Sequence, residues 1–174
     1  MSDRIDAYAN ALFSVAQGEG NLDEVEDELF RFARALEGSD ALRTALTDEL
    51  IPAARRQSIV EDVLGGKASV TTTALLSFVV GAGRGRDLPE IIDRLVHRAA
   101  GAKNLAVAEV RSAVPLSDDQ RERLAAALAN ATGQAVTLKV VIDPSILGGI
   151  VAQVGDTVID GSVRSRLDQL TSRL

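Results

Sequence analysis

The stretch Leu88–Val114, LPEIIDRLVHRAAGAKNLAVAEVRSAV, contains the point at which the hydrophobic pattern of this chain changes. Up to Lys103, apolar residues recur every three or four positions, which is the spacing of one face of a helix. Residues 105–114, LAVAEVRSAV, lack that spacing and are rich in alanine and valine, which favours a strand instead. We therefore expect a helical domain over residues 1–104 and a small mixed α/β domain over residues 105–174.

Every periodic segment of the first 104 residues has the spacing of a helix. The clearest stripe is Leu22, Val25, Leu29, Phe32 and Leu36, at intervals of three or four residues. Asn21 precedes this stripe with Glu24 at the third helical position, a pattern that predicts an N-cap and capping box. Because the connections are short, we expect six helices packed nearly antiparallel as a bundle. The expected helices are 5–17, 22–38, 40–46, 52–64, 69–80 and one that opens at 87–89 and buries Ile91, Ile92, Leu95 and Val96.

The last 70 residues combine strand and helix signals. Ser117-Asp118-Asp119-Gln120 is a capping box that begins a helix, and Gly133 ends it. Residues 136–142 alternate in hydrophobicity with a period of two, which indicates a strand. A hairpin with its turn at Gly155-Asp156 follows, and Ser162 is the predicted cap of a final helix. The expected fold is thus α + α/β: a six-helix bundle followed by a small mixed domain.

The composition excludes several classes of function. Of the 174 residues, 46% are hydrophobic and 25% charged, as in ordinary globular proteins. There is no cysteine and one histidine, His97, so cysteine chemistry and sites that need two histidines are excluded. The net charge is −6, and residues 1–50 carry twelve acidic against four basic residues. With 3% aromatic residues and this charge, nucleic acid is an unsuitable ligand, and an apolar or basic partner is expected.

The sequence contains neither the pattern of a secretion signal nor an apolar segment long enough to span a membrane. The first six residues include acids where a secretion signal needs basic and apolar residues. The longest nearly apolar stretch, residues 74–82, is far shorter than the ~20 residues that span a bilayer. We therefore expect neither a secreted protein nor an integral membrane protein.

The glycine clusters and the isolated titratable residues do not form a catalytic pattern. Gly66-Lys67 is followed by alanine and lacks the first glycine of a phosphate-binding loop. Residues 81–85 follow a helix and have the wrong spacing for a dinucleotide-binding turn. His97 falls within a helix with no nucleophile motif nearby. Asp156 and Asp160 occupy positions where turn chemistry explains aspartate. A binding or assembly role is therefore expected.

Two of the expected helices are apolar on nearly all sides. Residues 7–16 contain only Asn10 and Ser14 as polar residues, and residues 74–80 contain only Ser77. Either both helices are central in the bundle, or a groove between them accepts a partner helix, with alanines allowing close approach. The candidate groove residues are Tyr8, Ala11, Leu12, Leu76, Val79 and Val80.

The C-terminal segment 143–167, DPSILGGIVAQVGDTVIDGSVRSRL, resembles the signature of the F-type ATP synthase delta subunit, which is called the oligomycin-sensitivity-conferring protein in mitochondria. The motif Tyr8-Ala9-x-Ala11-Leu12-Phe13 and the turn Gly83-Arg84…Leu88-Pro89 are similar to the same family. The total length also agrees, so the resemblance covers the whole chain.

This resemblance implies a stator subunit without catalysis, cofactor or metal. The helical bundle would bind the N-terminal helix of an alpha subunit, and the domain 105–174 would bind the b subunit of the peripheral stalk, with Arg164 and Arg166 as candidate stalk contacts. The complex would couple proton-driven rotation to ATP synthesis at the cytoplasmic face of the bacterial plasma membrane, and this chain would meet the membrane only through the complex. The alternatives are a helical adaptor of another assembly, and a small enzyme that uses the glycine-rich C-terminal segment.

Overall fold

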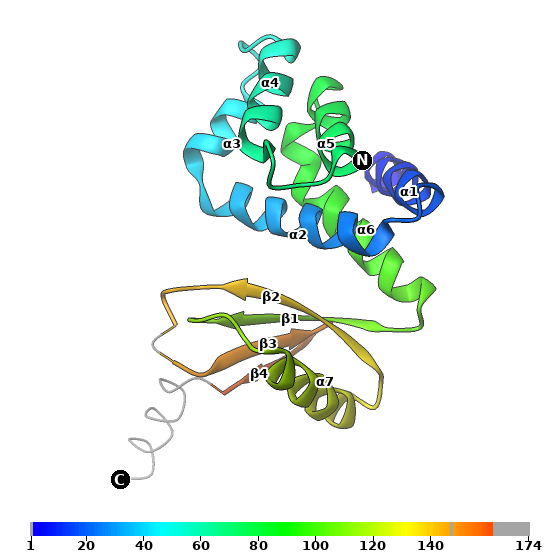
Figure 1. The fold of residues 1–174 in the computed structure, drawn as a ribbon, viewed down its shortest axis with the longest axis vertical. Helices are drawn as coiled ribbons and strands as arrows, with labels where there is room; N and C mark the ends of the chain where they lie inside the picture. The colour runs from blue at the N-terminus through cyan, green and yellow to red at the C-terminus, as the bar shows by residue number, and fades with distance from the viewer. Residues whose placement is uncertain (1, 147, 162–174) are drawn as a thin grey trace. The chain divides into compact units, whose positions relative to one another are not determined.

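A computed structural model describes residues 2–146 and 148–161, which fall into two compact units (Figure 1). We name Met1–Ala99 the helical unit and Ala100–Leu174 the mixed unit. The division lies slightly before the expected residue 104, because the last turn of helix α6 groups with the strand that follows it. An all-helical part is thus followed by a small part that contains a mixed sheet.

The helical unit contains the helices expected from the periodicity, at nearly the expected positions. Ser39 and Ser69 cap two of them: their Oγ atoms accept hydrogen bonds from the backbone N–H groups of Leu42 (3.3 Å) and Thr72 (3.2 Å). A 3₁₀ turn, η1, precedes the last helix. The elements are α1 (Ser2–Gly18), α2 (Leu22–Gly38), α3 (Asp40–Thr47), α4 (Ala53–Leu64), α5 (Val70–Gly81), η1 (Gly85–Asp87) and α6 (Leu88–Ala102).

One predicted cap is wrong. Asn21 precedes α2 as expected, but its side chain makes no capping hydrogen bond, and its φ of −121° and ψ of 28° lie outside the extended conformation of most N-caps. Its amide Nδ2 instead donates to Thr71 Oγ1 on α5, at 3.1 Å. This hydrogen bond directs the side chain toward α5, and its Oδ1 atom does not accept the capping bond that the sequence pattern indicated.

Helices α2 and α6 contribute the most buried apolar residues to the core of the helical unit. The predicted stripe of α2 is buried from Val25 to Leu36, and the four inward-facing residues predicted for α6 are all buried. Leu46 of α3 and Val60 of α4 extend the core at the other end. The exposed position of His97 on α6 agrees with its expected role as a surface residue.

The mixed unit is a four-stranded sheet with one helix against one face. The strand order is β2-β1-β3-β4; β1 and β2 are parallel, and the other two pairs are antiparallel. Leu128 of the helix packs on Ala108, Val110 and Ala152 of the sheet. The elements are β1 (Ala106–Ser112), α7 (Asp118–Thr132), β2 (Val136–Ile142), β3 (Ile150–Val154) and β4 (Thr157–Asp160).

The local signals of the mixed unit are confirmed by its geometry. Ser117 and Gln120 form both hydrogen bonds of the capping box at the start of α7. Gly133 ends the helix with φ of 71°, a left-handed conformation that glycine adopts without steric cost. The β3–β4 hairpin turns at Gly155-Asp156 as expected. The final helix predicted from Ser162 lies outside the described residues.

Candidate protein-interaction surface

Helices α1 and α5 are neighbours in the helical unit (Figure 1) and are in contact. At one end, the rings of Tyr8 and Phe78 are in contact, with their centroids 6.0 Å apart. At the other end, the Asn21–Thr71 hydrogen bond joins the residue just after α1 to the start of α5. Low residue numbers on α1 therefore face high residue numbers on α5.

Each of these two helices buries one apolar side and exposes another. The inner sides join the core, with Leu12 of α1 and Leu76 of α5 fully buried. On the outer side, Val15 is 46%, Phe78 56% and Val70 88% exposed. We name the exposed surface the α1/α5 face; it consists of Tyr8, Ala11 and Val15 on α1 and Val70, Ala74 and Phe78 on α5.

The α1/α5 face is made of two regular stripes. Residues 8, 11 and 15 follow each other at intervals of three and four, and residues 70, 74 and 78 at intervals of four. Such spacing places the members of each stripe on one side of a helix. All six residues lack a charge, so the face offers apolar contact without a buried charge to neutralise.

The structure divides the predicted groove residues between the face and the core. Tyr8, which is partly buried, and Ala11, which is exposed, belong to the α1/α5 face. Leu12, Leu76, Val79 and Val80 do not line it: each is buried in the core of the helical unit. Arg164 and Arg166, the predicted stalk contacts, lie outside the described residues.

Sequence reasoning missed Val15, Val70, Ala74 and Phe78 as surface residues. A helix that is apolar on all sides gives no periodic signal to tell its inner side from its outer one. The signal that could have found them is a second apolar stripe on each helix, residues 8, 11 and 15 on α1 and residues 70, 74 and 78 on α5. These stripes are offset from the ones that include Leu12 and Leu76.

The N-terminus of α5 is anchored by Glu28 of α2. The Glu28 carboxylate accepts hydrogen bonds from the backbone N–H (3.0 Å) and Oγ (2.8 Å) of Ser69, and from Oγ1 of Thr72 (2.5 Å). Partial burial of the carboxyl would raise its pKa, but these hydrogen bonds and the charge of Arg31 outweigh that effect, and the pKa of Glu28 lies below its ordinary value.

Helix α4 holds α5 from another side. The amide Nε2 of Gln57 donates to the backbone carbonyl of Ser77, at 3.0 Å. A Cβ atom at Gly81 would lie 2.5 Å from that same Nε2 atom. Together with Glu28, these contacts fix the position of α5 and so keep its outer stripe facing outward.

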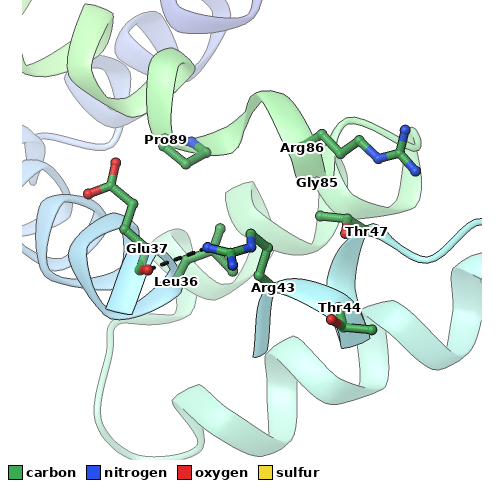
Figure 2. A pocket seen from close by; sticks show the side chains of 8 residues that line it. All are labelled: Leu36, Glu37, Arg43, Thr44, Thr47, Gly85, Arg86 and Pro89. Carbon is green, nitrogen blue, oxygen red and sulfur yellow. Dashed lines mark hydrogen bonds between the residues drawn. The ribbon is translucent and has the colours of Figure 1, made fainter. Parts of the chain in front are cut away.

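A hollow of about 270 Å³ lies elsewhere on the helical unit, between the end of α2, α3 and η1 (Figure 2). The Arg43 guanidinium is directed toward the backbone carbonyl of Glu37, at 3.5 Å, whereas the Arg86 side chain points away from the other lining side chains. The polar groups that line the hollow therefore do not converge on a common point, as those of a ligand site do. The lining residues are Leu36, Glu37, Arg43, Thr44, Thr47, Gly85, Arg86 and Pro89.

The described residues form neither a metal-binding cluster nor a membrane-spanning helix. Within residues 2–146 and 148–161, no group of three or more His, Cys, Asp or Glu side chains could hold a metal ion. Over the same described part of the chain, the helices are too short or too polar to cross a membrane.

Comparisons with known proteins point in one direction. The family model for the ATP synthase delta (OSCP) subunit matches residues 5–174. ATP synthase subunit delta of Streptomyces avermitilis is 44% identical over 173 residues, which cover 99% of this chain and 63% of the relative. The Kineococcus radiotolerans protein of the same name is 44% identical over 94% of this chain and 59% of its own length. This chain thus spans less than two thirds of these curated relatives.

A solved structure has the same fold. It is a chain in the cryo-EM structure of the Toxoplasma gondii mitochondrial ATP synthase hexamer, with a TM-score of 0.56 and 25% sequence identity. The match covers 97% of this chain and 96% of that chain. The similarity therefore extends over both units, including the helices that carry the α1/α5 face.

Proposed function

This chain belongs to the ATP synthase delta (OSCP) subunit family, and from that premise we propose that it is a non-catalytic stator subunit of a proton-translocating F-type ATP synthase. It links the catalytic head to the peripheral stalk, so that proton-driven rotation of the rotor produces ATP. The bacterial relatives and the match to a chain of a mitochondrial ATP synthase support this role. The subunit acts as a peripheral protein at the cytoplasmic face of the bacterial plasma membrane.

The partner of the α1/α5 face is the N-terminal helix of an alpha subunit. The single observation that supports this assignment is the exposed apolar surface formed by two packed helices, with Ala11 and Ala74 leaving room for a third helix. Docking an amphipathic helix into such a groove is a common mode of peptide recognition. The six helices of residues 1–104 act here as one bundle whose purpose is to present this face.

The mixed unit binds the end of the b subunit of the peripheral stalk. Its own core, formed by Leu128 against Ala108, Val110 and Ala152, supports a role as a separate attachment point. Arg164 and Arg166 remain the proposed contacts with acidic groups on the stalk. A stator with two independent attachment points resists torque without any chemistry of its own.

A stator must hold its partners for long times, and apolar burial supplies slow dissociation. Burying an exposed valine or phenylalanine contributes about 1.5–3 kcal/mol. Charges at the exposed rim mainly change the association rate. Raising the salt concentration should therefore slow association of the alpha-subunit helix and leave its dissociation rate nearly unchanged; a dissociation rate that rises steeply with salt would contradict the apolar account.

The proposed function can be tested with the intact chain and two ligands. Tyr8 is the only tyrosine and there is no tryptophan, so the intrinsic fluorescence of the chain reports from the α1/α5 face. Titration with a peptide that comprises the N-terminal helix of the cognate alpha subunit should change this signal to saturation, and titration with ATP should not. Binding of nucleotide with robust hydrolysis would favour a small enzyme; no response to the peptide would favour an adaptor of another assembly.

A further inference from the structure

The α1 stripe ends on charges of opposite sign. Arg4 lies one turn before Tyr8 and continues the stripe at its N-terminal end. Glu19 lies one turn after Val15, and its backbone N–H still donates to the Val15 carbonyl at 2.9 Å, as in a helix. Both side chains are exposed, and neither forms an ion pair with another described residue. The stripe is therefore positive at one end and negative at the other.

The charges near each end do not cancel this polarity. At the Glu19 end, Glu24 follows within three residues of Asn21, whose side chain contacts the start of α5. Lys67, in the connection that precedes α5, is a basic residue near this end. The carboxylates of Glu19 and Glu24 thus oppose one ammonium group, and this end keeps a negative charge.

The neighbourhood of Arg4 is different. Asp3 is adjacent in sequence, but successive residues of a helix point about 100° apart, so its side chain lies off the stripe. The next carboxylate along α1, Asp6, is paired with Arg94 of α6 at 3.1 Å. Arg4 is therefore the charge that borders the α1/α5 face at this end.

We propose that the helix bound by the α1/α5 face lies parallel to α1, with an acidic residue near its N-terminus against Arg4 and a basic residue near its C-terminus against Glu19. Acidic residues near the N-terminus and basic residues near the C-terminus are also the arrangement that a helix's own dipole favours. A helix laid in the opposite direction would bring like charges together at both ends. This inference rests on the proposed function.

The spacing of the two charges sets the length of the segment that is recognised. Arg4 and Glu19 are fifteen residues apart on a helical path, which corresponds to roughly 22 Å at 1.5 Å per residue. The matching acidic and basic residues of the partner should therefore be about four turns apart. Between them, apolar residues at intervals of three and four would meet Ala11, Val15, Ala74 and Phe78.

The orientation can be measured with a nitroxide spin label on the peptide. The alpha-subunit peptide is prepared with one label at its N-terminus or at its C-terminus, and each form is added to the full chain uniformly labelled with ¹⁵N. The N-terminal label should broaden the amide signals of residues 4–8, and the C-terminal label those of residues 15–19. The reverse pattern, or equal broadening of both ends by each label, would overturn the inference while leaving the proposed function intact. A peptide that does not bind would overturn both.

Charge reversal gives a second, independent test. Arg4→Glu and Glu19→Lys should each slow association of the unlabelled peptide about two- to fivefold at low salt, as expected for exposed ion pairs, and the effect should disappear at high salt. Arg55→Glu and Glu61→Lys, on exposed positions of α4, make the same changes in charge away from the face. Equal effects of the α1 and α4 variants would show that net charge alone acts, and would overturn the inference.

Discussion

Shortening Phe78 to alanine tests most directly whether the α1/α5 face holds a partner. Phe78 is 56% exposed in the free chain and contacts Tyr8. A phenylalanine presents about 200 Å² of surface, so roughly 110 Å² of Phe78 remains for a partner to cover. At about 25 cal/mol per Å², covering that area stabilises a complex by about 2.5–3 kcal/mol. Since alanine retains a small part of this contact, Phe78→Ala should cost about 2 kcal/mol of binding free energy, or about a 30-fold increase in Kd.

The same substitution should affect the fold much less than the binding. Less than half of Phe78 is buried in the free chain, so its truncation should lower the free energy of unfolding by about 1–2 kcal/mol, below the 3–5 kcal/mol typical of a fully buried phenylalanine. Binding is measured by the fluorescence anisotropy of a labelled alpha-subunit peptide titrated with the full chain. Circular dichroism melts of the same samples show that the helices remain folded at the titration temperature.

Leu50→Ala is the matched control. Leu50 is 91% exposed, in the connection between α3 and α4, and is not part of the α1/α5 face. Its removal should leave Kd within twofold of the unmodified chain. The reasoning is refuted if Phe78→Ala changes Kd by less than about threefold in a folded protein, or if Leu50→Ala weakens binding as much as Phe78→Ala does.

Three further predictions concern the α1/α5 face, the packing of η1 on α3 and the anchor of α5. Because Ala11 is exposed, Ala11→Asp should leave the chain folded. It should remove measurable peptide binding, because an unpaired charge in an apolar contact costs several kcal/mol, whereas Ala11→Ser should still bind the peptide. Equal peptide titrations for both variants would contradict this. Gly85→Ala should lower the free energy of unfolding in urea by about 1–3 kcal/mol, since its Cβ would lie 2.4 Å from the Leu46 carbonyl oxygen, and an unchanged value would contradict that packing. Glu28→Gln should cost about 1 kcal/mol near pH 7. Partial burial of Glu28 is outweighed by hydrogen bonds from Thr72 and its neighbours, so the pKa of Glu28 is lowered. The contribution of Glu28 to the free energy of unfolding is therefore complete above the ordinary pKa of 4.5 and is lost as the pH falls through the pKa of the folded state. A difference in stability between the unmodified chain and Glu28→Gln that does not shrink in acid would contradict this.

The sequence by itself determined the type and order of the elements. Periodicity and turn signals located the described α-helices and strands, although not the 3₁₀ turn η1. A helix or strand with one buried side must repeat apolar residues at its own period. Local chemistry placed the ends where it had no competitor: Ser117 and Gln120 form their capping box, and Gly133 ends the helix that follows. These signals depend on neighbours in sequence, so they can be read without knowledge of the fold.

Only the tertiary structure decided which apolar residues face outward. On α1, Leu12 and Val15 are both apolar, yet Leu12 lies in the core and Val15 on the α1/α5 face. On α5, Leu76 and Phe78 differ in the same way: Leu76 is buried and Phe78 is exposed.

The same holds for Asn21, whose side chain contacts α5 because the fold brings Thr71 within reach. The physical reason is common to both cases. Burial and long-range hydrogen bonds depend on what packs against a residue, and an all-apolar helix carries no local pattern that says which of its sides will be covered.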